Sequence, residues 1–280
     1  MRLIASIAFT LVAVLAIFLA LVWWQQERIV FQPPQPPSEG VPSWARQVTY
    51  EADDGQPLLG YFVGAGDAAE GVPATRLVLA FHGNADLAVW QIPWARELAR
   101  RTGARVLLAE YRGYGGLAGT PTYRGSGRDA RAAYDFARDS LGAPAADVVL
   151  FGHSLGSAVA TELAAHLAGR GAAPHALVLQ SPFTSARAMA RLVVSRPVSW
   201  AWRAISRVHF DSERLVASLG APVWIAHGER DLIVPVRMGK ALHDAAKVKG
   251  ELLLLPRAGH NDVAMAGGAE YWRWMGRAVR

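Results

Sequence analysis

The first two dozen residues of the chain differ from the rest in how apolar residues are distributed. From Leu3 to Trp24 the sequence contains no charged residue. As a helix, at 1.5 Å per residue, this run can cross a hydrocarbon core about 30 Å thick, and it ends in Trp23 and Trp24, residues favoured at the bilayer interface. The pattern predicts an uncleaved transmembrane anchor over residues 1–26. A cleaved signal peptide is the alternative, but its apolar core is typically shorter, about 7 to 15 residues.

A proline-dense segment follows the apolar run. Residues Gln32 to Pro42 read QPPQPPSEGVP, a composition typical of a semi-rigid polyproline spacer. We therefore expect a linker over residues 27–46 that holds a domain off the membrane. Charge orients the anchor only weakly, because Arg2 lies on one side and Glu27 and Arg28 on the other. The expectation is a single-pass anchor with the domain outside the cytoplasm.

Residues 47–280 have the pattern of one α/β domain. Apolar runs bounded by Gly, Pro and Asn alternate with stretches of helical period, which is typical of a largely parallel sheet with helices on both faces. The strands are predicted at Gln47–Glu51, Leu58–Val63, Leu77–Phe81, Arg105–Glu110, Val148–Phe151, Ala176–Gln180, Val223–His227 and Glu251–Leu255. The helices are predicted at Ala88–Thr102, Arg124–Leu141, Leu155–Gly169, Val236–Lys247 and Asp262–Val279.

Composition excludes several function classes. The chain has no cysteine, so a thiol nucleophile, a disulfide and a thiolate metal site are all impossible. The net charge is +6, but the arginines are scattered along the chain and form no basic stripe of the kind that binds nucleic acid. We therefore expect no nucleic-acid partner.

A serine is predicted at the junction of a strand and a helix. The strand Val148–Phe151 runs directly into Gly152-His153-Ser154-Leu155-Gly156, and a helix-forming stretch follows. In such an elbow the serine backbone is strained, small neighbours let strand and helix approach, and the hydroxyl stands exposed at the helix N-terminus. Ser154 is therefore the candidate nucleophile.

A serine hydroxyl needs a base, and that base needs an acid that orients it. Asp231 follows the strand Val223–His227, and His260 follows the strand Glu251–Leu255. Both places lie at the carboxyl ends of strands, where ligand-binding and catalytic groups of open α/β sheets collect. We expect Asp231 rather than the nearby Glu229 to be the acid and His260 to be the base.

The strand Leu77–Phe81 ends in His82-Gly83-Asn84-Ala85, where glycine allows a sharp turn. The backbone amides of Asn84 and Leu155 are the candidate donors of an oxyanion hole. A simple strand-terminal turn is the alternative. The substrate-pocket candidates, which lie beside these donors or in the turn after the next strand, are His82, Gly83, His153 and Tyr111.

Taken together these motifs resemble a known family. The segments that carry the resemblance, which covers about residues 48–275, are His82–Ala85, Tyr111–Gly115, Gly152–Gly156, Asp231 with Val234-Pro235, and Gly259–Asp262. They look like the α/β-hydrolases of the serine aminopeptidase-like and depalmitoylase-like branch. The resemblance implies an α/β-hydrolase fold with an eight-stranded sheet and acyl transfer to water by Ser154, His260 and Asp231, with no cofactor and no metal. Relatives often carry Arg at the position of His153 and Asp at that of Glu110, so substrate preference does not transfer.

The fold commonly inserts a cap where this chain has residues 182–212. Apolar residues and arginines are interleaved there, which favours either an acyl-binding lid near the bilayer or a solvated helical excursion. The expected function is hydrolysis of a carboxylic ester or thioester of a small-molecule or lipid-like acyl substrate. An aminopeptidase or amidase with the same triad is one alternative, and a catalytically silent binding scaffold is the other.

Overall fold

The protein contains one mixed sheet of eight strands. A computed structural model describes residues 2–35, 40–64, 66, 76–193 and 206–280, and the strand order is β1-β2-β4-β3-β5-β6-β7-β8. The strands are β1 (Arg46–Glu51), β2 (Pro57–Val63), β3 (Leu77–Phe81), β4 (Arg105–Ala109), β5 (Val148–His153), β6 (Ala176–Gln180), β7 (Val223–Gly228) and β8 (Lys249–Leu255). β1 and β2 are antiparallel to their neighbours, and the other six strands run parallel. The predicted mostly parallel eight-stranded sheet is confirmed.

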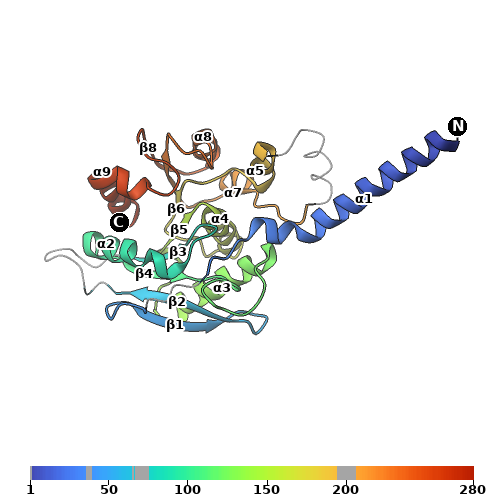
Figure 1. The fold of residues 1–280 in the computed structure, drawn as a ribbon. Helices are drawn as coiled ribbons and strands as arrows, with labels where there is room; N and C mark the ends of the chain where they lie inside the picture. Colours follow the sequence, from blue (N-terminus) through green and yellow to red (C-terminus); the bar gives the residue numbers. More distant parts are fainter. Residues whose placement is uncertain (1, 36–39, 65, 67–75, 194–205) are drawn as a thin grey trace.

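Helices cover both faces of the sheet (Figure 1). The side chains of α2 (Ile92–Thr102) and α9 (Val263–Ala278) share one apolar cluster with strand residues such as Val78 and Ala80. A second cluster, on the other face, contains Leu77 and Leu79. It also takes in residues of α3 (Tyr123–Asp139), α4 (Leu155–Ala168), α7 (Ser212–Val216) and α8 (Val236–Ala245). Alternate residues of β3 thus face opposite clusters, as strand geometry requires.

Proline accounts for one difference from the predicted elements. Instead of one helix over Ala88–Thr102, the structure has a 3-10 turn, η2 (Ala88–Gln91), followed by α2. Pro93 lies in the first turn of α2, where its missing N–H costs nothing, whereas inside a helix its ring would clash with the carbonyl four residues earlier. A second 3-10 turn, η3 (Ala145–Asp147), precedes β5.

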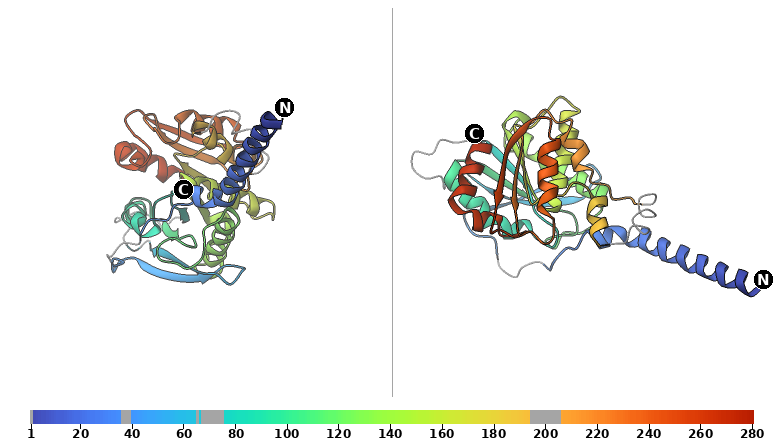
Figure 2. Two further views of the ribbon diagram at one scale, coloured as in Figure 1. Left: turned by 45° about the vertical axis from the view of Figure 1, so that its right-hand side comes forward. Right: turned by 90° about the horizontal axis from the view of Figure 1, so that it is seen from above.

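The N-terminal helix α1 (Arg2–Val30) is 29 residues long. Within the described ranges it is the one helix long and apolar enough to cross a membrane. It projects away from the body of the molecule and leaves it at the end that carries α5 (Ala186–Val193) (Figures 1 and 2). Its apolar side chains from Ile4 to Leu21 are largely exposed.

The end of α1 packs on the domain, which differs from the expected spacer. The side chain of Gln26 is fully buried, and Phe31 is 3% exposed within the main apolar cluster. The proline-rich stretch therefore begins after the chain has already joined the domain. Its described residues lead from Phe31 towards Ala45, which is again buried, just before β1.

The expected cap is described only in part. Residues 194–205 lie outside the described ranges, and with them part of the interleaved apolar and arginine residues of residues 182–212. The described part contains α5, where Leu192 is exposed, and the residues leading into α7. Val208 and Phe210 from this part are buried in the main apolar cluster.

Candidate active site

Ser154 lies in a strained turn between β5 and α4. Its backbone has φ 51° and ψ −115°, and a positive φ is costly for a residue with a β-carbon. The two flanking glycines are explained by space. A Cβ at Gly152 would lie 2.2 Å from the carbonyl oxygen of Gly156, and one at Gly156 would lie 2.1 Å from that of Phe81. Only glycine lets strand, helix and β3 approach closely enough to form this elbow.

The hydroxyl of Ser154 meets an imidazole that comes from another part of the chain. His260 Nε2 lies 2.9 Å from Ser154 Oγ, and His260 Nδ1 lies 2.7 Å from Asp231 Oδ2. With the proton on Nδ1, the ring donates to the carboxylate and accepts from the hydroxyl. The structure thus brings together the three residues singled out in the sequence, from the ends of β5, β7 and β8. Glu229, the competing acid, is exposed.

Asp231 is held as a carboxylate. Burial opposes its ionisation, but hydrogen bonds from His227, His260 and the Val234 N–H outweigh burial and hold the pKa of Asp231 well below its usual range. Its Oδ1 accepts from the backbone N–H groups of Ile233 and Val234 at 2.9 and 2.8 Å. The acid is therefore ionised at neutral pH and cannot rotate away from the imidazole.

Two side chains hold the backbone of His260. Ser181 Oγ donates to the His260 carbonyl at 3.0 Å, and His153 Nε2 lies 3.2 Å from the same oxygen. Ser181 follows β6 and has φ 49°. The sequence analysis missed it; its position just past a buried strand was the only available signal, and that signal gives no chemical role.

Burial keeps His153 neutral. Burial, with a smaller contribution from the nearby His260, lowers the pKa of His153 to about 4. The unfolded chain therefore binds a proton at His153 between about pH 6.5 and pH 4 that the folded protein does not bind. Its contribution to stability is complete above pH 6.5 and is lost as the pH falls through this window, by at most about 3 kcal/mol.

Replacing His153 by a residue that does not titrate should flatten the acid dependence of stability. We expect the free energy of unfolding of His153→Gln to fall less between pH 7 and pH 4.5 than that of the wild type, by about 2 kcal/mol. The measurement is urea unfolding of the full chain in detergent at the two pH values. Equal pH dependence in both proteins would show that His153 is not a buried neutral histidine.

The turn after β3 is fixed by a buried ion pair. His82 Nε2 donates to Glu110 Oε1 at 2.6 Å, with both side chains almost fully buried. Burial lowers the pKa of His82, but Glu110 raises it more, so the net shift is upward. Tyr111 donates its hydroxyl to the His82 carbonyl at 3.1 Å and is itself 1% exposed. His82 and Tyr111 thus support the turn that carries Asn84.

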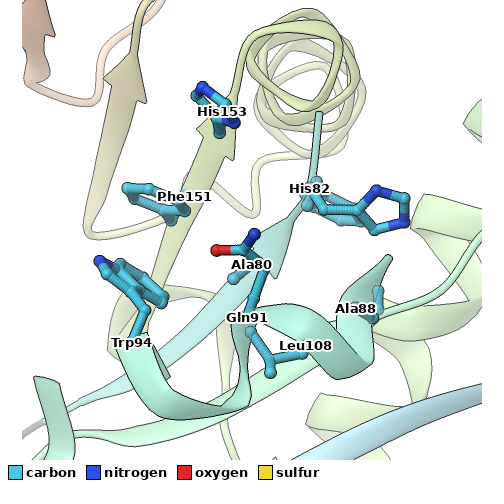
Figure 3. A pocket seen from close by; sticks show the side chains of 10 residues that line it. Ala80, His82, Ala88, Gln91, Trp94, Leu108, Phe151 and His153 are labelled. Carbon is cyan, nitrogen blue, oxygen red and sulfur yellow. The ribbon is translucent and has the colours of Figure 1, made fainter. Parts of the chain in front are cut away.

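A small pocket lies beside the elbow (Figure 3). Ten residues line it: Ala80, Phe81, His82, Ala88, Gln91, Trp94, Leu108, Ala109, Phe151 and His153. His153 and Phe151 come from β5, and the carboxamide of Gln91 reaches between Trp94 and His82 (Figure 3). Two of the four predicted pocket residues, His82 and His153, line it, whereas Gly83 and Tyr111 do not. Gly83 instead packs against His153, since a Cβ there would lie 3.0 Å from His153 Nδ1.

Within the described ranges no group of three or more His, Asp or Glu side chains is arranged to hold a metal ion. A hydroxyl, an imidazole and a carboxylate in sequence form the arrangement that activates a serine for attack on a carbonyl.

Comparison with known proteins places this geometry in context. A sequence model of the family described as serine aminopeptidase, S33, matches residues 73–214. An uncharacterized protein of Mycobacterium tuberculosis is 35% identical over 253 residues, which cover 88% of this chain and 84% of that protein. Lysophosphatidylserine lipase ABHD12 of Danio rerio is 38% identical over 157 residues, which cover 51% of this chain but only 40% of the lipase.

Solved structures share the fold. An esterase of Pyrococcus furiosus superposes with a TM-score of 0.66 at 18% identity, covering 89% of this chain and 98% of the esterase. A bacterial heroin esterase gives a TM-score of 0.65 at 21% identity, covering 87% of each chain. At these identities the likeness extends to the fold alone.

Proposed function

The chain belongs to the serine aminopeptidase S33 family of α/β-hydrolases, and from this premise we propose that it is a serine hydrolase that cleaves carboxylic ester or thioester bonds of hydrophobic acyl substrates. One observation carries the proposal. Ser154, His260 and Asp231 form a continuous chain of hydrogen bonds of 2.9 and 2.7 Å. The serine lies at the N-terminus of α4, where the helix dipole favours developing negative charge.

The reaction has two halves. Ser154 Oγ attacks the carbonyl carbon while its proton passes to His260 Nε2, and Asp231 stabilises the resulting imidazolium. The oxygen of the tetrahedral intermediate accepts from the N–H groups of Asn84 and Leu155. The carbonyl reforms as the alcohol or thiol leaves with the proton from His260, which gives an acyl-enzyme. Water then repeats the sequence, releases the carboxylic acid and restores Ser154.

The lipase among the relatives supports an ester rather than an amide as the bond that is cleaved. The family takes its name from an aminopeptidase, but ABHD12 is a lipase. An amide uses the same three residues but has a poorer leaving group, which His260 must protonate more fully. An aminopeptidase or amidase is therefore the second candidate, supported by the family name. Turnover of aminoacyl anilides measured beside esters of equal acyl length separates the two.

A lipid-like substrate agrees with the position of α1. The end of this helix contacts Asn84, so the carboxyl edge of the sheet with Ser154 lies next to the proposed membrane anchor. We place the anchor in residues 1–26, as the sequence predicts, and the catalytic domain, residues 47–280, outside the cytoplasm. An acyl chain could then pass from the bilayer to Ser154 without crossing bulk water.

Active-site labelling tests the proposed reaction. A fluorophosphonate probe should label the full-length protein on Ser154, identified by mass spectrometry of the labelled peptide, and should block turnover of 4-nitrophenyl esters. A series of esters of increasing acyl length then measures the preference for hydrophobic acyl groups. Absence of labelling under conditions in which a known serine hydrolase reacts would favour the silent scaffold instead.

The anchor has its own expected result. The full chain should stay in the membrane pellet after washing with alkaline carbonate and should be released by detergent, because about 20 apolar residues in one helix insert stably into a bilayer. The variant with arginine at both Leu11 and Val14, two exposed residues of α1, should lose this resistance. Recovery of the wild-type chain in the carbonate wash would contradict the anchor.

A further inference from the structure

The end of α1 is hydrogen-bonded to the turn that carries the proposed oxyanion donor. Asn84 Nδ2 donates to the carbonyl oxygen of Val30 at 2.7 Å. Asn84 Oδ1 accepts from the backbone N–H of Gln32 at 2.9 Å and from the hydroxyl of Tyr114 at 2.8 Å. The carboxamide is thus held on both of its polar atoms by backbone groups at the end of α1, the carbonyl of its last residue and the N–H of Gln32 two residues later.

This end of α1 is itself fixed to the domain. Gln26 Oε1 accepts from the Arg207 N–H at 2.7 Å, and Glu27 Oε1 accepts from the Tyr123 N–H at 3.1 Å. The guanidinium of Arg207 lies 4.4 Å from the centre of the Trp23 ring.

Phe31 adds an apolar contact to these polar ones. It is 3% exposed, and its ring meets that of Phe210 edge-on, with 6.4 Å between centroids. The segment from Gln26 to Gln32 is therefore built into the domain rather than tethered to it.

The turn at Asn84 needs such support. The next residue, Ala85, has φ 53°, a conformation that costs a non-glycine residue about 1 kcal/mol or more. A strained turn keeps its shape only if its neighbours hold it. The side chain of Asn84 is hydrogen-bonded to the end of α1 and to Tyr114. Asn84 therefore acts on the substrate through its backbone N–H.

We propose that the segment Gln26–Gln32 is a positioning element of the active site. Its hydrogen bonds to the Asn84 carboxamide fix the turn, so that the Asn84 N–H points at the oxyanion. The inference rests on the proposed hydrolase function and adds to it a role for the juxtamembrane end of the anchor. Oxyanion stabilisation depends on donors fixed in advance. Loss of the hydrogen bonds to the Asn84 carboxamide therefore lowers kcat and leaves substrate binding, measured by KM, nearly unchanged.

The test uses the full chain in detergent and 4-nitrophenyl butyrate as substrate. Asn84→Ala keeps the backbone N–H but removes the carboxamide and its hydrogen bonds to the end of α1. It should lower kcat about 10²-fold while KM changes less than about threefold. Gln32→Pro removes the N–H that donates to Asn84 Oδ1, together with the side-chain hydrogen bond from Gln32 Nε2 to the Ile29 carbonyl, and should lower kcat about 10-fold. Leu21→Ala is the matched control, because Leu21 lies on α1 outside the segment Gln26–Gln32 and is 53% exposed.

A second measurement separates positioning from stability. A short alkylboronic acid forms a tetrahedral adduct with a serine, and an oxygen of the adduct takes the place of the oxyanion. Its affinity should fall about 10²-fold in Asn84→Ala, whereas a purely structural role would lower Tm and leave both kcat and boronate affinity of the folded protein unchanged. That pattern would overturn the inference.

The inference and the proposed function fail in different ways. If Ser154→Ala is inactive but Asn84→Ala and Gln32→Pro both keep kcat within about threefold of the wild type, the hydrolase stands and the positioning role falls. If Ser154→Ala retains wild-type turnover, the proposed function itself is rejected. Should Asn84→Ala fail to fold, kcat of Gln32→Pro decides: a value equal to that of Leu21→Ala rejects the positioning role.

Discussion

Replacing Ser154 by alanine is expected to lower kcat for ester hydrolysis by about 10⁶-fold, the largest effect of any single change in this chain. The variant keeps the elbow and the pocket but has no oxygen to attack the carbonyl, so acyl-enzyme formation stops. The measurement is the rate of release of 4-nitrophenol from a short ester by purified full-length protein. It should be made with enzyme concentrations high enough to detect the residual rate.

The matched control for this change is Ser140→Ala. Ser140 is exposed at the C-terminal end of α3, far in the sequence from the elbow, and its replacement should leave kcat and KM as in the wild type. Near-wild-type turnover by Ser154→Ala would mean that another nucleophile acts. It would also remove the basis for the proposed chemistry.

Replacing Asp231 by asparagine should lower kcat by about 10⁴-fold without changing the shape of the site. Asparagine can still accept from the Ile233 and Val234 N–H groups through one oxygen. Its amide nitrogen, however, donates towards His260 Nδ1 and forces the proton to Nε2, so the ring can no longer accept from Ser154. The loss should appear in kcat with the thermal unfolding midpoint little altered.

Glu229→Gln provides the control for Asp231→Asn. Glu229 is two residues away in the same loop and was the competing acid in the sequence, but its side chain is exposed. It should keep wild-type kcat. If the two substitutions had equal effects, or if Glu229→Gln were the more damaging, the assignment of Asp231 as the orienting acid would be wrong.

The sequence predicted most of the fold because the fold depends on local pattern. Runs of four to six residues rich in apolar side chains predicted the strands, since a buried parallel strand needs apolar side chains on both faces. The boundary at α2 was missed, although Pro93 was visible, because a helical period continues across it. The structure continues the N-terminal helix four residues past the predicted anchor, to Val30, and the sequence carried no signal that this last turn packs on the domain.

The identity of the candidate site residues also came from the sequence, but their supports did not. Ser154 could be predicted because the glycines at 152 and 156 flank it, and only small residues there let the strand and the helix approach each other in an elbow. Asp231 and His260 were found because each follows a strand, and parallel strands end at one edge. Ser181 also follows a strand, but that position gave it no chemical role, because it acts by donating to a carbonyl oxygen 79 positions away in the chain.

What the sequence by itself determined, therefore, is an apolar helix long enough to span a bilayer, a parallel sheet, and three reactive side chains at strand ends. These follow from periodicity, length and the space around glycine, which neighbouring residues fix. Only the tertiary structure decided that His260 meets Ser154, that Glu229 faces solvent, and that α1 ends against Asn84 instead of at a spacer. Such contacts join residues far apart in the chain, and they form only where the packing of whole elements brings a donor within about 3 Å of its acceptor.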